Sequence, residues 1–233
     1  MRGYIKLTAA ILLFFQIGCS KIDGNFFGKG ISEGVIKYDL SFPYLSDDQM
    51  QIANLLPDEM TYTFTKDENQ SIISSIGFKT MIHAIEGSKE LKHYVKVLSK
   101  KVRCEYDENG VGQLMDTYPD LHIVETNQTD TLAGVVCKKA VGIFSDINQP
   151  SMDIYYTEEF DVKNPNWCNQ FAGLNGTLMM FEMEQFNLRM RLKATSIEKV
   201  PGEEIEFIKD NSYKNVDAHQ MNHELQEIFS SFF

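Results

Sequence analysis

The side chains with the widest range of chemistry in this sequence are four cysteine thiols, Cys19, Cys104, Cys137 and Cys168. A thiol can be acylated, can bind a metal or can be oxidised to a disulfide. Structural zinc sites combine cysteines and histidines at short spacings, and none of these four has such a neighbour. The sequence therefore predicts no metal site and no cofactor, and it leaves acylation and disulfide formation as the expected chemistry.

The three cysteines after Cys19 can form one disulfide outside the cytoplasm, which leaves one thiol free. Residues 132–144 and 152–157 are expected to form a hairpin that turns near Ile147, and this places Cys137 opposite residues 157–158. Cys168 follows in the next loop and is the first-choice partner for Cys137. The two pairings that involve Cys104 stay open as alternatives.

The first 20 residues have the pattern of a secretory leader. Arg2 and Lys6 supply positive charge, and the apolar run over residues 7–17 is too short to span a bilayer comfortably. The run ends in Gln16-Ile17-Gly18-Cys19, which resembles a bacterial lipobox, in which the cysteine is diacylated and becomes the new N-terminus. The resemblance implies acyl chains such as palmitate on Cys19, which would hold the chain at a membrane. A plain secretory signal cleaved near Gly18 and an uncleaved anchor are the alternatives.

The charge balance of the chain limits its partners. Acidic residues outnumber basic ones by 33 to 22, and the formal net charge is −11. Such a surface repels phosphate backbones, so nucleic acid is not an expected partner. A polybasic patch that binds anionic lipid headgroups is not expected either, so membrane attachment has to come from the leader.

No pattern in the sequence nominates a catalytic residue. The chain lacks a phosphate-binding Walker loop, a dinucleotide-binding glycine fingerprint, a Gly-x-Ser-x-Gly elbow and a His-Glu-x-x-His helix. His83, His93 and His122 stand alone in strand-like stretches, with no spacing that ties them to a nucleophile. We therefore expect a protein that is not an enzyme. A hydrolase with dispersed catalytic residues is the alternative.

The elements that must position these side chains are mostly strands. Ile36, Tyr38 and Leu40 alternate with polar residues, which is the period of a strand with one buried face. Many similar short runs recur, separated by turns, and predict a mainly β domain with a curved, largely antiparallel sheet. We expect a signal peptide over residues 1–18, a flexible tether over 19–33 and a single β-rich domain over 34–233.

Turn and cap residues mark where these elements end. Asp107-Glu108-Asn109-Gly110 contains the Asn-Gly pair typical of a tight hairpin, and predicts a turn between two strands. A short helix is expected over residues 47–56, with Ser46 as its N-cap. A second helix is expected over residues 216–232, at the C-terminus, because its apolar residues share one face.

Methionine and phenylalanine side chains are concentrated in the last predicted strands. Flexible methionines beside aromatic rings suit an adaptable apolar groove, although the same residues also suit an ordinary core. The residues that would line such a groove and contact an apolar ligand are Met179, Phe181, Met183, Leu188, Met190 and Leu192.

Four ordered landmarks lie in the C-terminal half of the sequence, namely residues 131–140, the stretch 154–158, the pair Asn166-Trp167 and the stretch 173–178, which begins Gly173-Leu174-Asn175-Gly176. In this order they resemble a family of uncharacterised Bacteroidetes envelope proteins. The family is named for its Gly-Leu-Pro-Gly-Leu-Ile motif, in which Asn175 here replaces the proline, and a related family of unknown function shares the plan. The resemblance implies an exported domain with a half-open barrel similar to the lipoprotein carriers LolA and LolB. No catalytic residues come with it.

Together these patterns predict a lipid-anchored protein of the cell envelope, facing the periplasm rather than the cell surface. Its expected partners are the membrane, through Cys19, and a hydrophobic ligand such as a lipid or the acyl chain of another lipoprotein. The competing interpretation is a structural or protein-interaction module with no ligand cavity, which binds another envelope protein. A continuous apolar pocket of several hundred cubic ångströms would separate the two.

Overall fold

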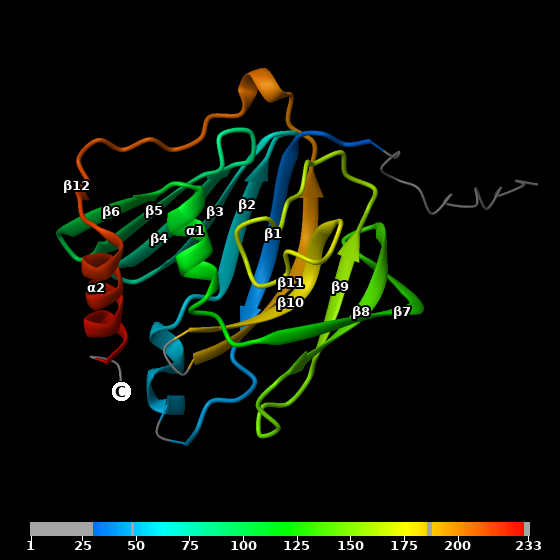
Figure 1. Cartoon of the computed structure of the whole chain (residues 1–233), viewed down its shortest axis with the longest axis horizontal. Helices are drawn as coiled ribbons and strands as arrows, with labels where there is room; N and C mark the ends of the chain where they lie inside the picture. Colours follow the sequence, from blue (N-terminus) through cyan, green and yellow to red (C-terminus); the bar gives the residue numbers. More distant parts are fainter. Residues whose placement is uncertain (1–29, 48, 186–187, 231–233) are drawn as a thin grey trace, which may run out of the picture.

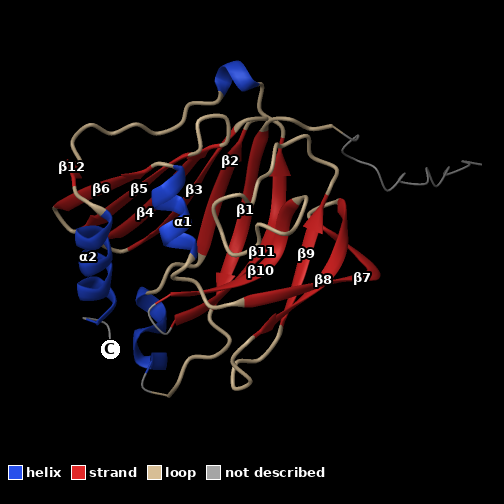
Figure 2. Ribbon diagram, viewed as in Figure 1, coloured by secondary structure: helices blue, strands red, loops and turns tan. Residues whose placement is uncertain are grey.

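The structure, a computed structural model, describes residues 30–47, 49–185 and 188–230. Twelve strands form one sheet in the order β12-β6-β5-β4-β3-β2-β1-β11-β10-β9-β8-β7. Figure 1 shows this sheet curving strongly from β6 round to β7, and Figure 2 shows the helices gathered beside it. All neighbouring strands are antiparallel except β12 and β6. The predicted fold class, a mainly β protein with an open, curved sheet and a C-terminal helix, is confirmed.

Apart from the long segments 158–176 and 199–213, the elements follow one another along the chain with short connections. In order they are β1 (Gly34–Ser41), the 3₁₀ helix η1 (Gln49–Leu55), β2 (Glu59–Phe64), β3 (Glu68–Ser75), β4 (Phe78–Ile85), β5 (Glu90–Val97), β6 (Lys100–Tyr106), α1 (Glu108–Met115), β7 (Leu121–Leu132), β8 (Val135–Phe144), β9 (Met152–Thr157), β10 (Thr177–Gln185), β11 (Leu188–Glu198), the 3₁₀ helix η2 (Gly202–Glu204), β12 (Lys214–Asn215) and α2 (Ala218–Ser230).

The alternating residues of β1 have one buried face, as their pattern predicts. Ile36, Tyr38 and Leu40 are buried on the concave face of the sheet, while the residues between them point away and are more exposed. The strand pairs with β2 on one side and with β11 on the other, so it lies in the middle of the sheet. Because the side-chain period of a strand is two, the same alternation in each neighbour produces one continuous apolar concave surface.

The helix α1 replaces the hairpin turn predicted at residues 107–110, so that prediction was wrong. The Asp107 side chain accepts a hydrogen bond from the Gly110 backbone N–H at 2.8 Å, which makes Asp107 the N-cap of α1. Asparagine and glycine then occupy the first turn of a helix instead of a β-turn. An N-cap satisfies backbone donors that a helix start leaves unpaired, and here it decides the local structure.

The other two predicted helices are present. Ser46 and Gln49 exchange hydrogen bonds between side chain and backbone, so Ser46 caps η1 as expected. Asp217 accepts a hydrogen bond from the Gln220 N–H at 2.7 Å and caps α2. In the described part of the chain no helix is both long and apolar enough to cross a membrane.

Two separate groups of side chains fill the concave side of the sheet. The larger cluster lies between β1, β2 and β8–β11 and the segment 158–176, which supplies Phe160, Phe171 and Leu174. The smaller cluster lies between β4–β6 and the two helices, where Met221 and Leu225 of α2 are buried. One half of the curved sheet is therefore filled by a loop, and the other half is covered by helices.

The segment 199–213 crosses the opposite, convex face of the sheet. Gln70 is buried there, and its side chain makes two hydrogen bonds of 3.1 Å with the backbone of Ile208. His83 stacks on Phe207 with 4.8 Å between the ring centroids. These contacts lead the chain across the sheet from β11 to β12, so that α2 reaches the concave side (Figure 1).

The landmarks of the family resemblance are joined by hydrogen bonds in the segment 158–176. Asn166 is buried, and its side-chain amide donates to the backbone carbonyls of Leu174 (3.0 Å) and Gly176 (2.8 Å). A Cβ on Gly176 would lie 2.7 Å from the carbonyl oxygen of Thr157, whereas a Cβ on Gly173 would meet nothing within 4 Å. Gly176 is thus required for the close approach of this turn to β9.

We expect the substitution Gly176→Ala to lower the free energy of unfolding by about 1–3 kcal/mol, because the added methyl group forces the turn away from the Thr157 backbone. Gly173→Ala is the matched control and should change stability by no more than about 0.5 kcal/mol. Urea unfolding followed by tryptophan fluorescence measures both. Equal effects of the two substitutions would contradict this role for Gly176.

Candidate ligand-binding cavity

A cavity of about 620 Å³ lies where the two apolar clusters meet. Its volume is within the roughly 300–1,000 Å³ typical of small-molecule sites. The concave faces of β1–β6, β10 and β11 form one wall. The other wall comes from α1 and the residues after it, from the segment 158–176, and from α2, which contributes Met221 and Leu225. Neither the loop nor the helices extend far enough to fill this junction.

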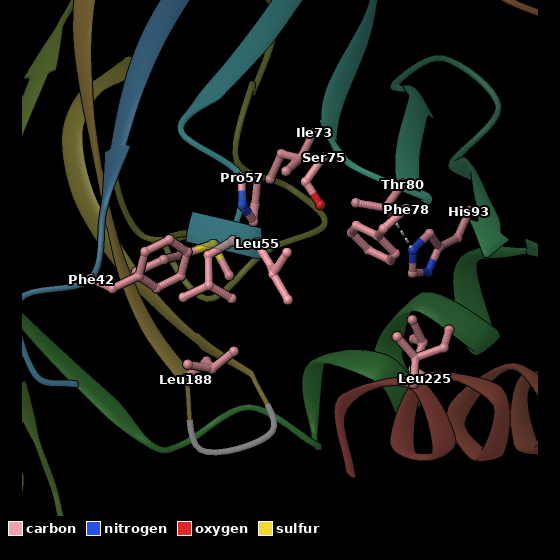
Figure 3. A pocket seen from close by; sticks show the side chains of 13 residues that line it. Phe42, Leu55, Pro57, Ile73, Ser75, Phe78, Thr80, His93, Leu188 and Leu225 are labelled. Carbon is pink, nitrogen blue, oxygen red and sulfur yellow. Dashed lines mark hydrogen bonds between the residues drawn. The ribbon is translucent and has the colours of Figure 1, made fainter. Parts of the chain in front are cut away.

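A smaller cavity of about 60 Å³ lies beside the large one, toward η1. It shares lining residues with the large cavity, among them Ile73, Met190 and Leu225. Figure 3 shows Phe42, Leu55 and Leu188 completing its walls. The two spaces are therefore neighbouring parts of one apolar region under the sheet.

The predicted groove residues divide into two groups in the structure. Phe181, Met183 and Met190 line the large cavity, and Leu188 lines the small one together with Met190. Met179 and Leu192 are fully buried in the larger cluster and line neither cavity. Met179 lies at a bulge of β10, where the register with β9 shifts, and this displaces it from the positions that face the cavity.

His93 is a polar residue of both cavity walls that the sequence did not single out. It lies on the concave face of β5, and its Nε2 is 2.9 Å from the Thr80 hydroxyl (Figure 3). Burial lowers the pKa of His93 to about 4, because a charged imidazolium would lose its hydration here. The imidazole is therefore neutral near pH 7 and acts as a hydrogen-bonding group of the wall.

Tyrosine side chains give one part of the large cavity a polar wall. The tyrosine cluster, as we call it, consists of Tyr62, Tyr106 and Tyr118. These residues lie on β2, on β6 and in the segment after α1, respectively. Burial raises the pKa of each phenol, that of Tyr118 to about 12. All three hydroxyls thus stay protonated and can donate hydrogen bonds. The three residues are far apart in sequence, so no local pattern could have predicted the cluster.

The expected disulfide between Cys137 and Cys168 is not formed in the structure, where Cys104, Cys137 and Cys168 are free thiols. The hairpin of β8 and β9 has the predicted register, since Lys138 lies opposite Tyr156. The segment 158–176 then turns across the concave side. It carries Cys168 to the cavity wall and the smaller cluster, whereas Cys137 is buried in the larger cluster.

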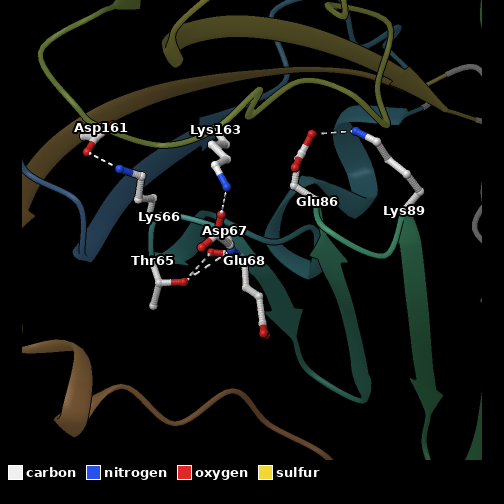
Figure 4. Close-up of polar contacts among 8 residues, drawn as sticks. All are labelled: Thr65, Lys66, Asp67, Glu68, Glu86, Lys89, Asp161 and Lys163. Atoms are coloured by element: carbon white, nitrogen blue, oxygen red, sulfur yellow. Dashed lines mark hydrogen bonds and ion pairs between the residues drawn. The ribbon is translucent and has the colours of Figure 1, made fainter.

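Ion pairs connect the segment 158–176 to the hairpin turns at the rim of the sheet (Figure 4). Lys66 lies 2.9 Å from Asp161, and Lys163 lies 2.6 Å from Asp67. Exposed pairs of this kind contribute about 0–1 kcal/mol each. The buried apolar residues of the segment therefore matter more for its position than these charges do.

The described part of the chain contains no candidate metal-binding site. Across those residues there is no group of three or more His, Cys, Asp or Glu side chains that could hold a metal ion. Burial raises the pKa of Cys168 to about 12, and this thiol is therefore protonated near pH 7. The cavity wall combines a mainly apolar surface with hydrogen-bonding groups such as His93 and the tyrosine cluster, and it also includes Glu184 and His219.

No family model matches this chain, and no curated protein matches it. The fold is similar to that of PNGF-II in two crystal forms. In the C2 form the TM-score is 0.51, with 16% identity, and the match covers 85% of this chain and 33% of that one. In the P21 form the TM-score is 0.50, with 15% identity, and the coverage is 82% and 32%. This chain thus spans about a third of the length of PNGF-II, and the likeness concerns the fold alone.

A β-barrel-like protein of the domain of unknown function DUF1849 from Brucella abortus is a more distant match. Its TM-score is 0.37, with 9% identity, over 74% of this chain and 100% of that one, which is too low to carry an argument. The resemblance to the Gly-Leu-Pro-Gly-Leu-Ile family and to LolA and LolB remains a prediction from the sequence.

The buried His93 should make the protein sensitive to acid. The unfolded chain takes up a proton on this residue near pH 6.5, but the folded chain does so only near pH 4. Stability is therefore lost as the pH falls through this window, and His93 accounts for about 2 kcal/mol of the loss at pH 5. Urea unfolding at pH 7 and pH 5 measures this difference.

The substitution His93→Gln removes the titrating group and keeps a partner for Thr80, so its loss of stability between pH 7 and pH 5 should be smaller by about 2 kcal/mol. His122→Gln, at an exposed position of β7, is the matched control and should behave like the wild type. If His93→Gln lost as much stability in acid as the wild type, the imidazole would not be neutral in the fold.

Proposed function

We propose that this chain is a cell-envelope lipoprotein that binds a hydrophobic ligand in the cavity between its curved sheet and its two helices. The cavity of about 620 Å³ is the observation that carries this proposal. Its wall combines apolar side chains such as Phe181, Met183 and Met190 with a few hydrogen-bonding groups. This composition is typical of sites that bind lipids and other apolar molecules.

The cavity supports ligand binding over the alternative of a structural module without a cavity. A sheet that only packs its own helices would be expected to bury its concave face at normal interior density. Here the concave face instead borders a space larger than a packing defect, although Tyr38, Met60 and Leu91 are buried around it. Flexible methionines at the wall suit a site that adapts to ligands of different shape.

The membrane anchor and the periplasm-facing location are proposed from the sequence. Cys19 and the leader lie outside the described residues, and the support for acylation is the lipobox-like stretch before Cys19.

The described chain makes its first contacts before the expected domain start at Gly34. Gly30 donates a backbone hydrogen bond to Glu159, and Ile31 forms a bridge with Phe160.

We propose a binding role without catalysis. Two titratable groups of the wall support this, because His93, with a pKa of about 4, is a weak base near pH 7, and Cys168 remains a thiol. A nucleophile needs an activated, deprotonated side chain or an adjacent base. The side chains of the cavity wall therefore suit binding of a ligand better than nucleophilic attack on it.

An uncharged fluorescent probe of apolar sites, N-phenyl-1-naphthylamine, tests ligand binding directly. We expect it to bind the wild-type protein, and we expect Ser71→Phe to lower its affinity at least about tenfold, because Ser71 lines the cavity and a phenyl ring fills the space. Ser74→Phe is the matched control, since Ser74 is an exposed residue on the other face of the same strand. Binding that is equal in both variants would place the probe outside the cavity.

Expression in a bacterial host with a lipoprotein pathway tests the anchor. The wild-type protein should fractionate with membranes, and intact-mass spectrometry without delipidation should find acyl chains on Cys19 and a co-purifying lipid. Cys19→Ala should release the protein or leave it as an unprocessed precursor. A membrane-bound Cys19→Ala protein of unmodified, processed mass would contradict the proposed anchor.

A further inference from the structure

The wall of the cavity has an unusual charge composition. Among the described residues, neither a lysine nor an arginine lines the large or the small cavity. The titratable groups in the wall are tyrosines, Cys168, His93, Glu184 and His219. His93 and the tyrosine cluster are uncharged near pH 7, and His219 is an exposed residue of α2, so the buried part of the wall offers no cation that would compensate a negative charge.

The cations nearest to the cavity are already paired. Lys89 acts on the Cys168 thiol from outside the wall, but its Nζ lies 2.6 Å from Glu86 and over the ring of Trp167. On the convex face, Glu182 is buried between two arginines. Its carboxylate lies 2.6 Å from Arg189 Nε and 2.7 Å from Arg191 Nη2.

Hydrogen-bond donors, in contrast, are available in the wall. The hydroxyls of Tyr62 and Tyr118 make no hydrogen bond to another described residue, and both side chains lie near Cys168. The Thr177 hydroxyl is buried and also lacks a partner among the described side chains and backbone. A buried donor without a partner is costly, so a ligand oxygen that accepts from Thr177 would remove that cost, and the two phenol hydroxyls are available to donate to the same ligand.

We propose that the ligand is an uncharged amphiphile, with an apolar chain in the cavity and an ester, ether or hydroxyl oxygen that accepts hydrogen bonds from Tyr62 and Tyr118 of the tyrosine cluster. This inference rests on the proposed function and specifies its ligand class. A carboxylate or phosphate would enter a poorly hydrated space without a cation, which is strongly unfavourable. The net charge of −11 also repels anionic amphiphiles before they reach the site.

Three probes that share a dodecyl-length chain and differ in headgroup charge test the proposal. They are monododecanoylglycerol, which is uncharged, dodecanoate, which is anionic, and dodecyltrimethylammonium, which is cationic. Each is titrated, below its critical micelle concentration at pH 7.5, into the complex with N-phenyl-1-naphthylamine. We expect the glycerol ester to displace the probe at a concentration at least tenfold lower than either charged compound.

The outcomes separate this inference from the proposed function. If the fluorescent probe binds and dodecanoate or the ammonium compound displaces it as well as the glycerol ester does, the inference about charge fails while the cavity remains a ligand site. If neither the probe nor any of the three compounds binds, the proposed function itself fails.

Two substitutions extend the test to named residues. Tyr118→Phe removes one donor and should weaken binding of the glycerol ester about threefold to tenfold, whereas Tyr155→Phe, outside the cavity wall, should leave it unchanged. Gln113→Lys adds a cation to the wall on α1 and should improve dodecanoate binding at least tenfold relative to the ester. An unchanged preference in both Tyr118→Phe and Gln113→Lys would overturn the proposal.

Discussion

The structure depends on a mismatch between a long curved sheet and the elements available to cover it. Twelve strands make a concave surface that one core cannot fill, so a loop packs into one half and two helices pack over the other. The apolar surface between them is neither fully packed nor open to water, and it encloses the cavity. Burial of the two clusters stabilises the fold, while the gap between them provides the proposed binding site.

Low polarity in this gap shifts the pKa values of several groups that border it. Removal from water lowers the pKa of His93 and raises the pKa of the Tyr62 and Tyr118 phenols, so all three side chains are uncharged near pH 7. Charged residues do occur close by, but they are paired with one another at the rim or on the convex face. We therefore expect the proposed site to select ligands by shape and hydrogen bonding.

The segment 158–176 links the stability of the fold to the shape of the cavity. Its own hydrogen bonds, from the buried Asn166 amide to two carbonyls, fix the turn that precedes β10. The same segment places Phe171 in the core and Cys168 at the cavity wall. The landmarks of the family resemblance that lie in this segment, Asn166 and the turn that ends at Gly176, thus have a structural role.

The sequence by itself determined the local structure of most elements and their faces. The alternation in β1, the serine cap of η1 and the hairpin of β8 and β9 each depend on residues close together in the chain. Local information failed at Asp107, because the same four residues suit either a hairpin turn or a helix start, and packing of Val111 in the smaller cluster favours the helix.

Only the tertiary structure decided which distant residues share a wall. It separated Cys137 from Cys168, removed Met179 and Leu192 from the predicted groove, and brought His93 together with Tyr62 and Tyr118. The physical reason is that the curvature of the sheet and the path of the covering segments set distances between residues that no local periodicity encodes.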